Sequence, residues 1–113
     1  MSNRDAKADV LQGTLDLLVL QTLESMGPQH GYGIAARLEQ VSAGALQLNM
    51  GTLYPALMRL EQRGLLRGAW GTTDSNRKAR FYALTAAGRR QLTTEKQAWD
   101  RMAGIIHAVL SGR

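Results

Sequence analysis

Large apolar side chains recur every three or four positions in the first third of the chain. Over Leu11–Met26 this spacing is typical of a helix that buries one face. Gly27-Pro28 ends the pattern, because proline cannot continue the helical hydrogen bonds. The spacing returns over Ile34–Val41, so the pattern predicts a second helix after the short connection His30–Gly33.

A third helix is predicted from about Asn49 to Gly64, because its leucines keep the same spacing and Gly64 is a suitable C-terminal stop. The start of this helix depends on Pro55, since proline is tolerated in a first turn but removes a hydrogen bond deeper inside. With Asn49 as the N-cap, Pro55 falls in the second turn and should bend the helix. With Gly51 as the N-cap, Pro55 fits without strain, and both starts stay open.

The pattern then changes to one that favours extended structure. Leu65–Gly71 and Arg77–Leu84 are predicted strands, the second because its aromatic residues have good strand propensity. The polar cluster Thr72–Asn76 between them is typical of a turn, so the two segments form a predicted hairpin. Thr85 is a good N-cap for a last helix that runs to about Leu110.

The last predicted helix carries apolar residues at seven-residue intervals, a spacing typical of a helix that pairs with another helix. These residues are Leu92, Trp99 and Ile106, with Met102 and Val109 in the complementary positions and Glu95 as the one interruption. A chain of 113 residues buries only a small core, which leaves apolar surface for a partner. We therefore expect a second copy of the chain to cover this helix.

These elements make the fold mainly α with a small β-hairpin. Three helices followed by a hairpin are the order of a winged helix-turn-helix, here with a long C-terminal helix added. In such a motif the later helix of the pair enters the DNA major groove. We expect a flexible N-terminus at 1–10, a winged helix-turn-helix DNA-binding domain at 11–84 and a C-terminal dimerisation helix at 85–113.

Basic residues are concentrated in one part of the chain. The net charge is +5, and residues 59–90 hold eight of the 14 Arg and Lys residues but only two of the nine acidic ones. This basic stripe covers the end of the third helix and the hairpin, and arginine suits bidentate recognition of phosphate and guanine. The stripe favours a nucleic acid as partner, with a solvated basic face as the alternative.

Several classes of protein are excluded by the residues that the sequence lacks. No cysteine is present to form a disulfide or a thiolate zinc site, and His30 and His107 have no carboxylate pattern near them. Gly31–Ala36 matches the dinucleotide pattern G-x-G-x-x-A only superficially, because a helix and not a strand precedes it. The longest apolar run, Leu17–Leu20, is far short of a membrane span. We expect a soluble, cytoplasmic protein that is not an enzyme and holds no metal ion or cofactor.

Four motifs, in this order and spacing, give the chain a family likeness that covers Leu11 to Leu110. Together they resemble the PadR family of bacterial transcriptional regulators, and the short C-terminus resembles its small subfamily with a single dimerisation helix. The motifs are Gly13-Thr-Leu-Asp-Leu17, His30-Gly-Tyr-Gly-Ile-Ala35, Gly51-Thr-Leu-Tyr-Pro-Ala-Leu57 with Arg59-Leu-Glu61, and Tyr82-Ala-Leu-Thr-Ala-Ala-Gly88. The resemblance implies a winged-helix homodimer that binds operator DNA, usually as a repressor and often relieved by a small molecule.

The resemblance also implies where DNA is contacted. The family's recognition helix matches Asn49–Gly64, its tyrosine in that helix matches Tyr54, and its basic wing matches the predicted hairpin. Met50 departs from the polar residue of many relatives, and a methionine there contacts either a thymine methyl group or nothing. The expected DNA-binding residues are Tyr32, Asn49, Met50, Thr52, Tyr54, Arg59, Arg77, Lys78 and Arg80.

Four of these residues have a second interpretation. Tyr32 either packs or touches the backbone. Tyr54 either offers its hydroxyl to a phosphate or packs its ring at a helix–helix contact. Arg59 either contacts DNA or forms a surface ion pair with Glu61 or Glu39. Asn49 is a helix cap, a base reader or both.

Trp99, with Met102 and Ile106, has two interpretations. On the predicted seam these residues are dimer core, whereas the resemblance to small family members implies a cavity at the dimer centre that accepts planar aromatic compounds. The expected partners are therefore double-stranded operator DNA, a second copy of the chain and a small aromatic effector, with the protein nucleoid-associated when bound to DNA. The rival hypotheses are a winged-helix module that binds an acidic protein, and a small-molecule binder that does not bind DNA.

Overall fold

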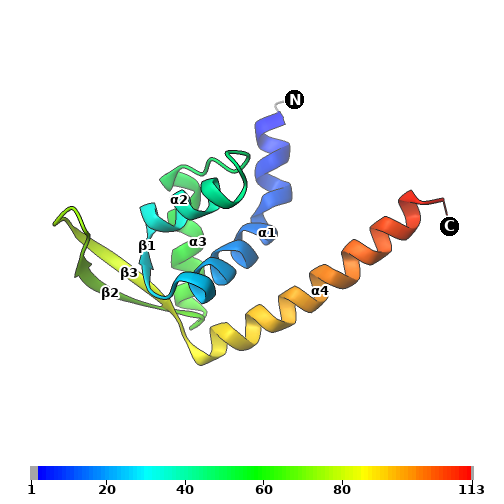
Figure 1. Ribbon diagram of the computed structural model, residues 1–113. Helices are drawn as coiled ribbons and strands as arrows, with labels where there is room; N and C mark the ends of the chain where they lie inside the picture. The colour runs from blue at the N-terminus through cyan, green and yellow to red at the C-terminus, as the bar shows by residue number, and fades with distance from the viewer. Residues whose placement is uncertain (1–2, 113) are drawn as a thin grey trace.

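The computed structural model describes the backbone of residues 3–112 and the side chains of residues 13–112. Three helices form one body, a β-hairpin projects from it as the wing, and a long last helix leaves it on the other side (Figure 1). The predicted order of elements is confirmed, with a short strand added. The elements are α1 (Asn3–Met26), β1 (Gln29–His30), α2 (Gly31–Val41), α3 (Met50–Gln62), β2 (Leu66–Thr72), β3 (Lys78–Leu84) and α4 (Ala86–Leu110).

The core lies where α1, α2 and α3 meet the inner face of the sheet. Its largest fully buried side chains are aliphatic, and each helix of the body contributes at least one of them: Val19, Leu20, Ile34, Leu53, Leu57 and Leu60. Burying a leucine or isoleucine of this kind contributes about 1.5–3 kcal/mol. Because α3 supplies three of the six, its inner edge is fixed and its other faces are left for function.

Helix α1 begins at Asn3, so the predicted start at Leu11 is wrong. The expected flexible stretch 1–10 therefore contains helical residues from Asn3 onward. Alanine, arginine and lysine in this stretch are strong helix formers. No apolar period marks the stretch, and the apolar period was the signal on which the sequence prediction relied.

The sheet has three antiparallel strands in the order β1-β3-β2, and β1 is the strand that the sequence pattern missed. It has two residues, paired as Gln29 with Tyr82 and His30 with Phe81. His30 is also the N-cap of α2, because its Nδ1 accepts a hydrogen bond from the Gly33 amide at 3.1 Å. The segment predicted as the connection His30–Gly33 is thus the end of a strand followed at once by a helix.

Of the two possible starts for α3, the structure has the one with Asn49 as the N-cap. Its Oδ1 accepts a hydrogen bond from the Thr52 amide at 2.9 Å. Pro55 consequently lies inside the helix. The predicted stop is confirmed: Gly64 has a φ of +75°, and the Leu65 amide donates to the Leu60 carbonyl at 2.9 Å.

The start of α4 packs closely on the end of the body. Thr85 is its N-cap, as predicted: the hydroxyl accepts from the Gly88 amide at 3.0 Å and donates to the Gly64 carbonyl at 2.7 Å. The buried residues of α4 are Gly88 and Leu92. The rest of the helix extends from the body as a free arm (Figure 1). Among the described helices none is long and apolar enough to cross a membrane.

Candidate nucleic-acid interface

Helix α3 turns one uncharged stripe away from the body. Its inner edge is made by buried Leu53, Ala56, Leu57 and Leu60. With 3.6 residues per turn, the opposite edge carries the exposed residues at spacings of four, three and four. These are Gly51, Pro55, Met58 and Gln62, and the Met58 residue is 56% exposed. We call this set the outward stripe of α3.

Arg59 lies on one flank of α3 and is held by an ion pair. Its Nη2 donates to Asp16 Oδ1 of α1 at 2.9 Å, and the Asp16 side chain is only 15% exposed. Neither acid considered from the sequence, Glu61 or Glu39, is the partner. Arg59 therefore connects α3 to α1, while part of its side chain stays accessible.

Tyr54 lies on the other flank of α3 and packs against the start of α2. A Cβ atom placed on Gly31 would lie 3.2 Å from Tyr54 Cε1 and 3.5 Å from its hydroxyl oxygen. The ring therefore sits at a helix–helix contact, as in the second interpretation from the sequence. It is still 40% exposed, and the neighbouring Tyr32 is 67% exposed. Part of the Tyr54 ring therefore remains accessible beside this contact.

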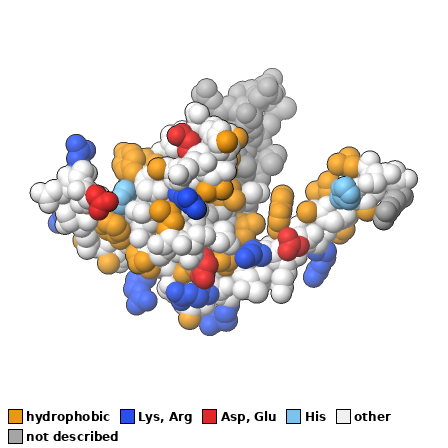
Figure 2. Space-filling model, viewed as in Figure 1, with side chains coloured by type: hydrophobic (Ala, Val, Ile, Leu, Met, Phe, Trp, Pro, Cys, Tyr) orange, Lys and Arg blue, Asp and Glu red, His pale blue; other side chains and the backbone are white. Residues whose placement is uncertain are grey.

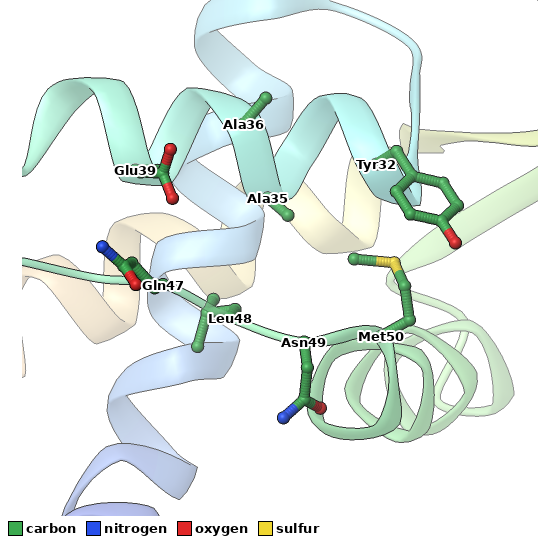
Figure 3. Close-up of a pocket in the computed structure, with 8 residues that line it drawn as sticks. All are labelled: Tyr32, Ala35, Ala36, Glu39, Gln47, Leu48, Asn49 and Met50. Atoms are coloured by element: carbon green, nitrogen blue, oxygen red, sulfur yellow. The ribbon is translucent and has the colours of Figure 1, made fainter. Parts of the chain in front are cut away.

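Met50 points into the helix-turn-helix. It is half-buried, packs against the core and lines a pocket of about 500 Å³ between α2 and the start of α3. Its side chain lies between Tyr32 and Ala35, whereas that of Asn49 points away from α2 (Figure 3). Met50 thus packs between the helices and does not belong to the outward stripe.

The Asn49 side-chain oxygen accepts the capping hydrogen bond, and the residue is exposed to solvent. Two substitutions distinguish its role as a helix cap from a role as a DNA contact. Asn49→Ala removes the cap, so the free energy of unfolding should fall by about 1 kcal/mol. Asn49→Ser keeps a capping oxygen but loses the amide, so the stability should hold. Fluorescence anisotropy measures the DNA affinity of each variant, and urea unfolding measures its stability. If the DNA affinity of Asn49→Ser is also unchanged, Asn49 is only a helix cap. A loss of affinity with unchanged stability makes it a DNA contact too.

Cations and aromatic rings lie together on one face of the wing. In β3, Arg80 lies on the same face as buried Tyr82, and across the ladder Trp70 is the partner of Arg80. Trp70 is 64% exposed, with Lys78 Nζ 5.3 Å and Arg80 Cζ 6.0 Å from its ring centre. Burial raises the pKa of the Tyr82 phenol, so its hydroxyl keeps its proton to a higher pH than the hydroxyl of an exposed tyrosine does.

The three basic residues predicted for the wing have different surroundings. Arg80 donates to Glu61 Oε2 of α3, and this hydrogen bond raises the pKa of Arg80. Arg77 and Lys78 are exposed, and no ion pair involves either within the described side chains 13–112. Of the three, the two that are free to meet an anion are thus at the outer end of the wing, where Figure 2 shows basic side chains at the left.

Sequence reasoning missed three surface residues. Met58 and Gln62 would have been found by taking the positions opposite the leucines of the third helix. Trp70 lies in a segment with two glycines, which weakened the prediction of a strand there. Which cations lie beside it depends on the register of the hairpin, and the register could not be predicted from the sequence.

The expected seam residues stand on the free arm of α4, far from the wing (Figure 1). Trp99, Met102 and Ile106 are each about half exposed in the single chain, and apolar side chains lie along the arm (Figure 2). Ile105, Val109 and Leu110 extend the same apolar surface. The structure therefore brings these residues together, but on a surface that no element within residues 13–112 covers.

Three helices followed by a two-stranded wing define a winged helix-turn-helix protein. A family model described as the PadR-like family of transcriptional regulators matches residues 19–94, and the chain belongs to this family. The resemblance seen in the sequence motifs is confirmed. Because the family consists of transcriptional regulators, the expectation that the chain is a regulator and not an enzyme is confirmed as well.

Individual relatives agree with this assignment. The chain is 41% identical over 90 residues to an uncharacterized 37.1 kDa protein in a transposon of Streptomyces fradiae, covering 80% of this chain but 24% of that protein. It is 38% identical over 65 residues to a transcriptional regulator of Mycobacterium tuberculosis, covering 58% of this chain and 60% of that one. The crystal structure of a PadR family transcriptional regulator from Eggerthella lenta matches with a TM-score of 0.78 at 28% identity, over 95% of this chain and 90% of that chain.

Proposed function

We propose that the protein is a homodimeric, sequence-specific DNA-binding regulator that represses transcription and is relieved by a small-molecule effector. The observation that carries the DNA-binding part is the combination of the uncharged outward stripe of α3 with free cations at the end of the wing. A helix with accessible polar and apolar groups can read bases, and cations on the wing can hold phosphates.

The proposed readout divides between the two elements. The Gln62 amide can bind an adenine edge with two hydrogen bonds, and the Met58 side chain can contact a thymine methyl group. Arg77 and Lys78 would contact phosphates, which fix the position of the protein on the duplex but carry no sequence information. Arg59 and Arg80, which are held by Asp16 and Glu61, would contribute less to the charge seen by DNA.

The proposed dimer uses the C-terminal part of the chain, 85–113, and within it α4 (Ala86–Leu110) is the dimerisation helix. Its half-exposed apolar side chains support this role, because a second copy would remove them from water. Two recognition helices would then read two half-sites about one helical turn, roughly 34 Å, apart. In this dimer Trp99 would either be part of the core or form the wall of a cavity for a planar aromatic effector.

Salt dependence of duplex binding tests the proposed function. Affinity should fall steeply between about 50 and 200 mM salt, and the slope of log affinity against log salt should be about 0.9 per phosphate contact. Neutralising Arg77 and Lys78 together, as Arg77→Gln/Lys78→Gln, should weaken binding to every duplex and reduce the slope by about 1.8. Arg80→Gln should reduce it by less, because Glu61 already pairs with this arginine.

Arg67→Gln is the matched control for these substitutions, because Arg67 is exposed but pairs with Ala83 on the opposite face of the wing. It should leave the salt slope unchanged. An unchanged slope in Arg77→Gln/Lys78→Gln would remove the wing from the interface. If the chain binds no duplex in a mobility-shift assay but binds an acidic protein, the rival hypothesis of a protein-interaction module replaces the DNA-binding one.

A further inference from the structure

Trp70 is the largest apolar side chain on the wing, and most of it faces solvent. A single exposed aromatic residue is ordinary on a protein surface. Trp70 differs because its surroundings are fixed and charged: Lys78 Nζ lies 5.3 Å from the ring centre on the same strand pair, and Arg80 Cζ lies 6.0 Å from it. An indole beside two cations is suited to a ligand that is both anionic and partly apolar.

The position of Arg80 is set by three neighbours. Its guanidinium is hydrogen-bonded to Glu61 of α3 and also lies 5.9 Å from the Tyr82 ring centre. It passes directly over Gly68, because a Cβ atom there would come within 2.6 Å of the Arg80 Nε and Nη2 atoms. Any larger residue at position 68 would displace Arg80. The indole of Trp70 therefore stands beside a group that the fold holds in place.

The register of the hairpin gives the direction in which Trp70 faces. Trp70 and Arg80 are directly opposite each other in the antiparallel ladder, so their side chains share one face of the wing. Arg80 reaches Glu61 on α3 from this face. Trp70 is thus on the side of the wing that is turned toward the proposed recognition helix.

We propose that Trp70 is a DNA-contacting residue that packs its indole against the deoxyribose-phosphate backbone of a duplex while Lys78 pairs with a phosphate beside it. This inference rests on the proposed function and adds an apolar contact to it. Duplex DNA fits the site because its backbone alternates anionic phosphates with apolar sugars. The bases of a duplex are stacked, so a ring on the wing meets the backbone first.

An apolar contact and a charged contact respond differently to salt. Trp70→Ala should weaken binding to a duplex of random sequence about tenfold at every salt concentration, equivalent to about 1.4 kcal/mol. The slope of log affinity against log salt should stay at the value of the unmodified chain. Lys78→Gln should instead reduce the slope by about 0.9. Trp70→Phe keeps a ring and should recover most of the lost affinity.

Tryptophan emission gives a second measurement that leaves Trp70 in place. In Trp99→Phe the only tryptophan is Trp70, and its emission should change when the random duplex is added at about 50 mM salt. In Trp70→Phe the only tryptophan is Trp99 on the arm of α4, and its emission should respond much less. Circular dichroism of each variant verifies that the fold is kept.

The possible results separate the proposals. If Trp70→Ala lowers the salt slope as much as Lys78→Gln does, Trp70 acts only by holding Lys78, and the direct contact is wrong. If Trp70→Ala binds like the unmodified chain and Trp99→Phe shows no change of emission, the contact is also wrong, although DNA binding stands. If the unmodified chain binds no duplex, both the contact and the proposed function are overturned.

Discussion

Replacing Gly88 with alanine should destabilise the protein by about 3 kcal/mol or more, which makes it the most damaging small substitution that the structure predicts. A Cβ atom at this position would lie 2.1 Å from the Leu65 carbonyl oxygen and 3.1 Å from Leu84 Cδ2. The carbonyl belongs to the backbone, so it cannot move aside as a flexible side chain could. Either α4 or the start of the wing must shift.

The shift would break contacts that hold α4 on the body. The Leu65 carbonyl also accepts a hydrogen bond from the Thr85 amide at 3.1 Å, and the Thr85 hydroxyl caps α4 through the Gly88 amide. Loss of this arrangement would expose Leu92, the large buried side chain of α4. Both the packing and the cap would therefore be lost in one substitution.

Gly104→Ala is the matched control, because it makes the same change in the same helix. Apart from the adjoining backbone of its own helix, no described atom lies within 4 Å of a Cβ atom placed on Gly104. Helix propensity alone should then stabilise the protein by about 1 kcal/mol. Urea unfolding followed by circular dichroism, at one fixed protein concentration because a dimer's stability depends on it, measures both variants. Equal stability of Gly88→Ala and the unmodified chain would mean that the start of α4 does not pack against the Leu65 carbonyl as described.

The elements that could be predicted from the sequence are those marked by a local signal, either an apolar periodicity or a capping residue. The long apolar periods gave α2, α3 and α4, and the caps at Asn49 and Thr85 and the stop at Gly64 follow from the chemistry of single residues. Strand β1 has two residues, too few to show any period, and it exists because β3 is already beside it. The early start of α1 also lacked an apolar period.

The positions of the candidate site residues along the chain could be predicted, but their contacts with residues far away in the sequence could not. Arg59 and Asp16 are 43 positions apart, and Arg80 and Glu61 are 19 apart. Such pairs depend on how helices and strands pack, so no local pattern indicates them. The sequence therefore treated Arg80 as a free cation, and for Arg59 it offered Glu61 or Glu39 as the ion-pair partner in place of Asp16. It did predict correctly that a basic wing would follow the third helix.

The same limit applies to the faces of α3. Periodicity identified the buried leucine edge, but the residues chosen as DNA contacts were Thr52, Tyr54 and Arg59, which lie on its two flanks. The position of Met50 shows why flanks are hard to assign, because its side chain is drawn into the space beside α2. The packing of the neighbouring element decides whether a flank is free or covered.

Ile106→Glu should convert the proposed dimer into a single chain, and this is the largest functional effect that we expect. Ile106 is about half exposed on the arm of α4, between Met102 and Val109 on the apolar surface. In a dimer it would be enclosed by the partner's apolar side chains. A buried carboxylate without a partner costs several kcal/mol, and each dimer would have to bury two of them.

Loss of the dimer should carry through to DNA and effector binding. Two linked half-site contacts can strengthen binding by about 10²–10⁴-fold over one, so Ile106→Glu should lose this factor on a two-half-site operator selected from random DNA. It should bind a single half-site as well as the unmodified chain does. In the Trp70→Phe background, quenching of Trp99 by a planar aromatic dye should also disappear, because the proposed cavity requires both chains.

Gln97→Glu is the control for the charge, because Gln97 is exposed on α4 and its helical spacing from Ile106 places it away from the apolar surface. It adds the same carboxylate and should leave the sedimentation velocity unchanged. If Ile106→Glu still sediments as a dimer at the concentration used for the unmodified chain, α4 does not form the interface. Dimerisation would then have to use another surface, and the half-site spacing expected from α4 would lose its basis. If instead dimers and two-half-site binding disappear together, the apolar arm of α4 is what couples the two recognition helices.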